Sequence, residues 1–439
     1  MAAEHGVPGA AVGILVGGDV HDEATGVLST VTEVPVTTDS LFQIGSITKL
    51  WTATVIMQLA EEKALDLDSL VVDCVPEFTT GGDGQAVGEI TIRQLLVHTS
   101  GIGDDYTPIS RGDDAIARYV SDVLPTLPTQ FRPGEGFLYS NPAYVLLGHI
   151  AETITGKSYS ALLRERITDP LGIDRWAVTE EAQPFSAAVG HVPTGANGAL
   201  EPAAVWSMSA AHSPAGSQVA MTAASLLTFA AALMAGGHPL VSAATLQQMW
   251  TPHPGLPDMG GAGGQLAIGG VIQHVGNTTV IAYDGATYGQ SASLRMLPDH
   301  NVAVVSLANG GNMFAFHQAV TCDLAAQATG ITLPTPPVPP PDPVPIDAAR
   351  VSGRYRGHDL EVEIAAGPDG GITVTEHPLT EELQTLLASG EPSVYVRLDD
   401  HRVIGLHTFA GMHPVITITA EPQSPVASVT HFGRVLHRI

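Results

Sequence analysis

The chain has 439 residues, of which 44% are hydrophobic, and this is enough to bury one large core and a second, smaller one. Its net charge of −26 argues against nucleic acid and anionic membrane as partners, since both require a basic surface. The sequence contains no run of about 18 apolar residues, so no transmembrane helix is predicted. The two isolated cysteines argue against a disulfide framework.

The N-terminal segment MAAEHGVPGAAVGILVGG lacks a basic start and a cleavage site, so no secretory signal is predicted and a cytoplasmic location is expected. Further along, strand and helix patterns alternate. Strands are predicted over residues 10–16, 270–274, 279–283, 292–297 and 302–307. Helices are predicted over 46–62, 91–97 (with Thr91 as N-cap), 141–156, 222–235 and 314–328. Strands at both ends with helices between them predict an α/β (α+β) domain, in which helices flank an antiparallel sheet closed by both termini, with an inserted helical region.

The segment LPTPPVPPPDPVP, residues 333–345, is too rich in proline for a helix or a central strand and predicts an extended linker. It separates a domain of residues 1–332 from one of residues 346–439. The second domain contains short strand patterns at near-regular intervals, over residues 350–355, 360–365, 372–376, 393–398, 403–406, 415–419 and 428–435. This spacing predicts a small all-β barrel or sandwich.

The segment QIGSITKLWTATVIMQL, residues 43–59, places Ser46 and Lys49 three residues apart on an apolar helix. The chain has only three lysines, the others being Lys63 and Lys157. Residues i and i+3 share one helix face, and a buried neutral amine one turn away could accept the proton of a serine nucleophile. Alone, the pair also fits a helix N-cap followed by a solvated lysine.

Two further segments carry candidate site residues. In FLYSNPAY, Tyr139 and Asn141 precede or open a helix, where a phenol can transfer protons and an amide can hold a lysine or a substrate carbonyl. The alternative is a core tyrosine and a helix-capping asparagine. In AYDGATYGQSASLRMLPD, Gly285 lets a ligand or backbone approach a strand end, where a substrate can dock as an added strand. The alternative is an ordinary glycine-containing strand end or bulge.

In this order, Ser46-Ile47-Thr48-Lys49, Tyr139-Ser140-Asn141 and Tyr283-Asp284-Gly285 resemble the serine β-lactamase and penicillin-binding-protein superfamily, in particular its class-C-like esterase, D-aminopeptidase and thioesterase branch. The supporting segments GVPGAAVGIL, LLVHTSGI and PLGI extend the resemblance over roughly residues 5–330. The C-terminal domain resembles the lipocalin-like barrel of some members.

The resemblance implies a mechanism. Ser46 would form an acyl-enzyme, Lys49 and Tyr139 would share proton transfer, and Asn141 with the 283–285 triad would bind substrate. The backbone N–H groups of Ser46 and Ala286 would form the oxyanion hole.

One departure stands out. The third triad usually begins with Lys or His, or with Trp in some esterase-like members, whereas here it begins with the neutral phenol of Tyr283. This argues against efficient β-lactamase activity.

Three functions follow from these residues. The first is a serine hydrolase acting on an ester or amide, including amides of D-amino acids. The second is an acyltransferase, such as a thioesterase that cyclises a nonribosomal peptide, and the third is an acyl-binding sensor without turnover. Each predicts a small-molecule or peptidyl acyl substrate, with no cofactor and no metal, since the 18 histidines show no ligand spacing. His98 is expected to hold a helix end, and Arg434 and Arg438 are expected on the barrel surface, with a substrate carboxylate as the alternative partner.

Overall fold

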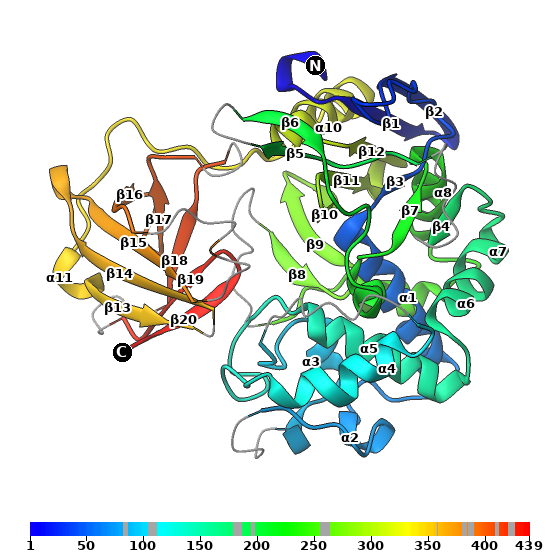
Figure 1. Cartoon of the computed structure of the whole chain (residues 1–439), viewed down its shortest axis with the longest axis horizontal. Helices are drawn as coiled ribbons and strands as arrows, with labels where there is room; N and C mark the ends of the chain where they lie inside the picture. Colours follow the sequence, from blue (N-terminus) through cyan, green and yellow to red (C-terminus); the bar gives the residue numbers. More distant parts are fainter. Residues whose placement is uncertain are drawn as a thin grey trace.

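The computed structural model describes residues 1–81, 87–103, 112–178, 187–194, 198–254, 264–357, 359–379, 384, 390–408, 412–419 and 426–439. It contains two bodies joined by one chain segment (Figure 1). The larger body carries a sheet with helices on both faces, and the smaller one is a β-barrel. No helix within the described ranges has both the length and the apolar character needed to cross a membrane.

A seven-stranded antiparallel sheet organises the larger body, in the order β2-β1-β12-β11-β10-β9-β8. The strands are β1 (Gly9–Val16), β2 (Asp19–Gly26), β8 (Gln265–Ala267), β9 (Gly270–Val275), β10 (Thr278–Thr287), β11 (Gln290–Leu297) and β12 (Val302–Ala308). Because β1 pairs with β12, the two ends of this domain meet in one sheet, with Ala10 opposite Ala308 and Val16 opposite Val302. The predicted antiparallel sheet closed by both termini is therefore confirmed.

Side-chain alternation along the strands separates the two faces of this sheet. Val304 packs in a cluster that includes Ala325 of α10 (Met313–Thr329). Val305, the next residue, packs in the main core with Leu227 of α8 (Ala223–Met234). Helix α10 thus covers one face of the sheet, whereas α8 and the helical region cover the other.

The helical region contains the central helix α1 (Thr48–Glu61) and α5 (Asn141–Thr155), which pack together. The shorter helices of this body are α2 (Val71–Cys74), α3 (Ile92–Leu96), α4 (Ala115–Arg118), α6 (Tyr159–Leu163), α7 (Asp169–Leu171) and α9 (Ala243–Met249). Two small sheets join β3 (Phe42–Gln43), β7 (Val219–Met221) and β4 (Trp176–Val178), and β5 (His191–Thr194) with β6 (Ala199–Pro202). Helix starts follow the sequence signals, since Thr91 forms a capping box with Gln94 at the start of α3.

The C-terminal strands close into an eight-stranded barrel, because β20 pairs back onto β13. Its strands are β13 (Gly353–Arg356), β14 (Leu360–Ala366), β15 (Ile372–Pro378), β16 (Ser393–Arg397), β17 (Arg402–Gly405), β18 (Val415–Thr419), β19 (Ser428–His431) and β20 (Arg434–Arg438). A short helix, α11 (Ala348–Val351), precedes it. A separate hydrophobic cluster, with Tyr355, Val362 and Ile416 among its members, packs within the barrel domain.

Two predictions for this domain need correction. The strand predicted over residues 350–355 begins only at Gly353, because the residues before it form α11. The single strand predicted over residues 428–435 is two strands, β19 and β20, joined by a tight turn at Phe432 and Gly433. Both turn residues have positive φ, 48° and 73°, which matches the turn that suits the twist of a hairpin.

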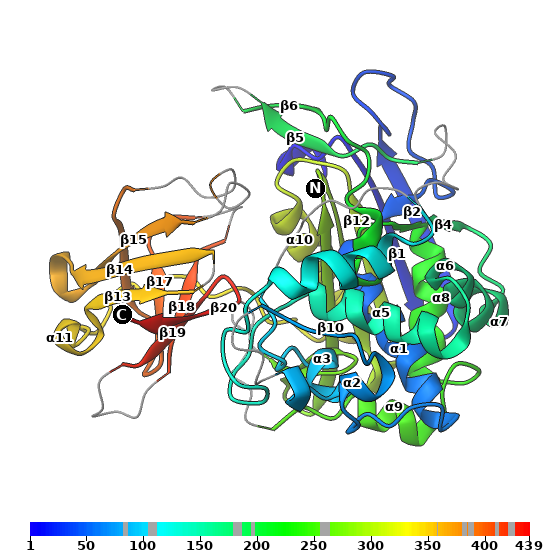
Figure 2. The ribbon, with the colours of Figure 1, turned by 60° about the horizontal axis from the view of Figure 1, so that its bottom comes forward.

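The hairpin of β19 and β20 lies on the side of the barrel that faces the larger body (Figures 1 and 2). An ideal Cβ atom placed on Gly433 would lie 3.7 Å from Cβ of Tyr139. The barrel therefore reaches a residue that the sequence places in the site.

Candidate active site

Ser46 lies in a 3-10 turn, η2 (Gly45–Ile47), that leads directly into α1. Gly45 before it has φ of 54°, and a Cβ atom at this position would lie 2.4 Å from the backbone nitrogen of Ala286. Only glycine satisfies both the left-handed backbone and this close approach. The tight turn thus presses the serine-bearing segment against strand β10.

Lys49 is fully buried one turn after Ser46. Its Nζ atom lies 3.1 Å from Ser46 Oγ, 2.7 Å from Asn141 Oδ1 and 2.6 Å from the carbonyl oxygen of Ala215. The structure therefore brings Ser46 and Lys49 of the first motif together with Asn141 of the second, and adds a backbone carbonyl. Ala215 ends a 3-10 segment, η8 (Ala210–Ala215), and no side chain identifies its carbonyl in the sequence.

Tyr139 lies immediately before α5, and its ring centroid is 4.8 Å from Lys49 Nζ. The ring of Tyr144 is 5.7 Å from the same atom. Two aromatic rings thus lie close to the buried amine.

His98 holds the segment that carries Tyr139. Its Nδ1 atom accepts the backbone N–H of Ser140 at 3.1 Å, and its carbonyl accepts the N–H of Leu138 at 2.9 Å. Burial, with the charge of Lys49 as a second cause, lowers the pKa of His98 to about 3. The imidazole is therefore neutral at pH 7, and it acts at a helix start as the sequence predicted. Ser140 caps this helix through the N–H of Ala143, which leaves the amide of Asn141 to bind Lys49.

Strand β10 supplies the third motif. A Cβ atom on Gly285 would lie 2.0 Å from the carbonyl oxygen of Ile44 and 2.7 Å from the backbone nitrogen of Ser46. The backbone of residues 285–286 therefore lies directly against the turn of Ser46. This places the backbone segments that carry the amides of Ser46 and Ala286 side by side.

The side chains of the third motif lie on opposite faces of the sheet. Tyr283 packs against the main core on the face of Ser46, where burial and the neighbouring Tyr144 and Tyr139 raise its pKa well above its ordinary value. It is thus a neutral phenol. Asp284 alternates to the face of α10, where its carboxylate pairs with Arg295 at 2.6 and 2.9 Å.

The two arginines of the barrel have protein partners. Arg434 follows the hairpin turn, and its Nε atom lies 2.7 Å from the carboxylate of Asp359, while its Nη1 atom donates to the carbonyl of Phe432. The guanidinium of Arg438 stacks 5.6 Å from the ring of Tyr355, at the other end of β20. Of the two, only Arg434 adjoins the residue that meets Tyr139.

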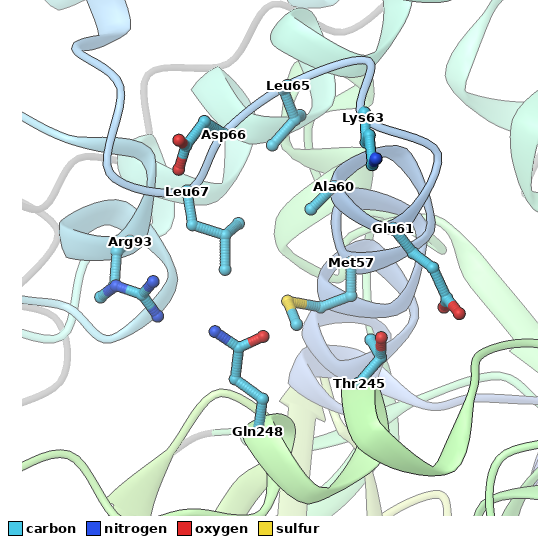
Figure 3. Close-up of a pocket in the computed structure, with 10 residues that line it drawn as sticks. All are labelled: Met57, Ala60, Glu61, Lys63, Leu65, Asp66, Leu67, Arg93, Thr245 and Gln248. Atoms are coloured by element: carbon cyan, nitrogen blue, oxygen red, sulfur yellow. The ribbon is translucent and has the colours of Figure 1, made fainter.

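A cavity of about 490 Å³ lies elsewhere, at the C-terminal end of α1 (Figure 3). Its charged lining is already paired in part, since Arg93 binds Asp68 and Glu61 accepts the N–H of Ser242. No serine of the three motifs lines it. Within the described ranges, no group of three His, Cys, Asp or Glu side chains is placed to hold a metal ion.

Fold and site together define the class of protein: an antiparallel sheet covered by helices on both faces, with Ser46 and Lys49 at the start of a central helix. The family model described as Beta-lactamase matches residues 1–327, and the chain belongs to this family, within the serine β-lactamase and penicillin-binding-protein superfamily.

Three relatives illustrate the likeness. Penicillin-binding protein 4 of Amycolatopsis lactamdurans is 36% identical over 367 residues, which cover 81% of this chain and 94% of that protein. The crystal structure of SurE with D-Leu has 26% identity and a TM-score of 0.76, covering 100% of this chain and 96% of that one. D-amino acid amidase from Ochrobactrum anthropi SV3, complexed with L-phenylalanine amide, has 25% identity and a TM-score of 0.61, covering 70% of this chain and 88% of that one.

Proposed function

We propose that the protein is a serine hydrolase that cleaves an amide or ester bond of a D-amino acid derivative through an acyl-enzyme on Ser46. The observation that carries this proposal is the contact of the fully buried Lys49 Nζ atom with Ser46 Oγ. A buried amine with an apolar and aromatic surround is the kind of base that can activate a serine hydroxyl.

The reaction begins when Ser46 Oγ attacks the substrate carbonyl carbon and its proton passes to Lys49 Nζ. The oxygen that becomes negative lies between the N–H groups of Ser46 and Ala286. Collapse of the tetrahedral intermediate breaks the bond to the leaving group, which takes up a proton through Tyr139. Water then attacks the carbonyl carbon of the acyl-enzyme and gives up one proton to Lys49. The ester bond to Ser46 breaks, Ser46 Oγ takes up that proton, and the acid product leaves.

Two observations support a D-configured, uncharged acyl group. The similar protein SurE has been crystallised with D-Leu, and the similar enzyme of Ochrobactrum anthropi is a D-amino acid amidase. Tyr283, in turn, is a neutral phenol at the position where the motif usually has a cation. A substrate carboxylate would therefore find no opposite charge on this side chain.

The test uses p-nitrophenyl acetate and the p-nitroanilides of D- and L-phenylalanine. We expect preference for the D-anilide, with loss of turnover in Ser46→Ala and a decrease of roughly 10²–10⁴-fold in Lys49→Ala. Lys63→Ala is the matched control, because Lys63 lines the distant cavity of Figure 3 and should leave the rate unchanged. Equal turnover by wild type and a folded Ser46→Ala protein would contradict the proposal.

A second candidate is acyl transfer to an amine, such as cyclisation of a peptidyl thioester. It is favoured by the barrel hairpin, because Gly433 lies close to Tyr139 and so brings the second domain to the proposed site. A peptidyl thioester with a free N-terminal amine tests it by mass spectrometry. A cyclic product supports transfer, whereas linear acid alone supports hydrolysis, and a long-lived adduct on Ser46 without either product supports the acyl-binding sensor.

A further inference from the structure

The segment of Pro214, Ala215 and Gly216 is wedged between the nucleophile turn and α5. A Cβ atom on Gly216 would lie 2.3 Å from the carbonyl oxygen of Gly45. A Cβ atom on Gly148, in α5, would lie 2.2 Å from the ring of Pro214. The close fit leaves the carbonyl of Ala215 pointing at Lys49 Nζ, 2.6 Å away.

Thr52 binds this segment from α1. Its Oγ1 atom lies 2.6 Å from the carbonyl oxygen of Pro214 and 2.7 Å from the hydroxyl of Tyr159 at the start of α6. Burial raises the pKa of Tyr159, so its hydroxyl keeps its proton. A carbonyl can only accept, and the Pro214 carbonyl is nearer to Thr52 Oγ1 than the Thr48 carbonyl, which lies at 3.3 Å. The Thr52 proton is therefore directed at Pro214, and Tyr159 donates to Thr52.

The peptide unit next to Pro214 is the one that presents the Ala215 carbonyl to Lys49. A neutral lysine amine has two N–H bonds and one lone pair. If the N–H bonds point at Asn141 Oδ1 and the Ala215 carbonyl, the lone pair is left to face Ser46 Oγ. Movement of the carbonyl would therefore turn the lone pair away from the serine proton.

We propose that Thr52, held by Tyr159, is a positioning residue that fixes the Ala215 carbonyl and so aims the Lys49 amine at Ser46. This rests on the proposed function, in which Lys49 accepts the proton of Ser46. The hydroxyl of Thr52 bonds to the carbonyls of Pro214 and Thr48 and to the hydroxyl of Tyr159. It acts through the backbone of residues 214–215.

Loss of the Thr52 hydroxyl is expected to lower the pKa of Lys49. A carbonyl acceptor favours the ammonium form of lysine over the amine. When the Ala215 carbonyl is no longer fixed, the ammonium loses an acceptor and the pKa of Lys49 falls. In a plot of acylation rate against pH, the decrease on the acid side then moves to lower pH. The rate at the optimum also decreases, because the amine is no longer oriented toward Ser46.

The experiment measures the Lys49 pKa directly. Protein labelled with ¹³C-lysine gives signals from only three lysines, and Lys49→Ala assigns the site signal. Wild type is compared with Thr52→Val, which keeps the shape and removes the hydroxyl, and with Tyr159→Phe. Thr54→Val is the matched control, since Thr54 is equally buried on α1 but donates to Leu50 of its own helix. Thr52→Ser is the rescue.

We expect the Lys49 signal of Thr52→Val to titrate about one unit lower than in wild type, with acylation by p-nitrophenyl acetate reduced roughly tenfold. Tyr159→Phe should shift it in the same direction, Thr54→Val should not shift it, and Thr52→Ser should restore it. An unshifted Lys49 signal in a folded Thr52→Val protein, or an equal shift in Thr54→Val, would overturn the positioning role. The titration needs no substrate, so its outcome is independent of the proposed hydrolase activity. That activity is contradicted separately, if none of the probes acylates the wild-type protein.

Discussion

The side chain of Tyr283 occupies the position where the family's third motif usually carries lysine or histidine. It lies on the face of Ser46, near Tyr139 and Tyr144, and burial keeps it uncharged. In the described part of the chain, the buried amine that contacts Ser46 is that of Lys49, which also binds Asn141 and Ala215. Selection of a substrate carboxylate by this strand would need a new charge.

Tyr283→Lys is therefore expected to change substrate selection. Penicillin G and its methyl ester differ only in the charge of one carboxylate, so the ratio of their acylation rates isolates the effect. We expect the ratio of free acid to ester to rise about tenfold in Tyr283→Lys, through a new charge-assisted hydrogen bond. Tyr283→Phe removes the hydroxyl without adding charge and should leave the ratio near that of wild type. An unchanged ratio in a folded lysine variant would show that this position does not contact the carboxylate.

At the scale of elements, two buried histidines attach helices to their surroundings. His98 binds the first turn of α5 through Ser140. His317, on α10, bridges Ser291 and Ser306 at 2.7 and 2.8 Å. Burial lowers the pKa of His317 to about 4, as it lowers that of His98 to about 3. Both rings are held as neutral groups that accept at least one hydrogen bond.

These shifts predict acid destabilisation. In the folded protein, the pKa of each histidine lies below the ordinary value near 6.5. At pH values between the folded and the ordinary pKa, the unfolded chain therefore binds more protons than the folded one. The stability contributed by the neutral rings is present above pH 6.5 and decreases as the pH falls toward 4. The loss approaches about 1.4 kcal/mol per pH unit for each histidine.

Urea unfolding at pH 7.5, 6.0 and 5.0 measures this slope. His98→Asn keeps an acceptor for the N–H of Ser140 and suits the left-handed backbone there, φ 57°, but does not titrate. We expect a smaller loss of stability between pH 7.5 and 5.0 in this variant. A slope identical to that of wild type would mean that His98 does not titrate differently on unfolding.

On the scale of the whole molecule, the barrel approaches a residue of the candidate site. The turn at Gly433 meets Tyr139, and the turn is held by Arg434 bound to Asp359 and by His431, whose Nε2 atom is 2.8 Å from Glu376. The hairpin at this point limits the space beside the side chain of Tyr139.

Gly433→Leu is expected to fill that space. We predict that turnover of D-phenylalanine p-nitroanilide falls at least about tenfold, as expected for overpacking, while that of the small p-nitrophenyl acetate changes less. Gly276→Leu controls for backbone strain, because Gly276 also has positive φ in a hairpin turn but has open space around it. Equal losses for both substrates in Gly433→Leu would show that the hairpin does not discriminate by size.

Much of the local structure was predictable because its causes are local. The spacing of Ser46 and Lys49 fixes one helix face, Thr91 and Gln94 form a cap within four residues, and alternating patterns locate β9 to β12. The hairpin at Phe432 was missed because phenylalanine is a strand-favouring residue and an unusual one at positive φ, which left Gly433 as the only signal in the sequence.

By itself, the sequence determined the antiparallel sheet closed by both termini, the all-β C-terminal region and the candidate residues Ser46, Lys49, Tyr139 and Asn141. Only the tertiary structure decided that the Ala215 carbonyl faces Lys49, that Asp284 lies on the face of α10, and that Gly433 meets Tyr139. The physical reason is that periodicity and capping act over a few residues. A backbone carbonyl has no identity in the sequence, and contacts across hundreds of residues depend on how the elements pack.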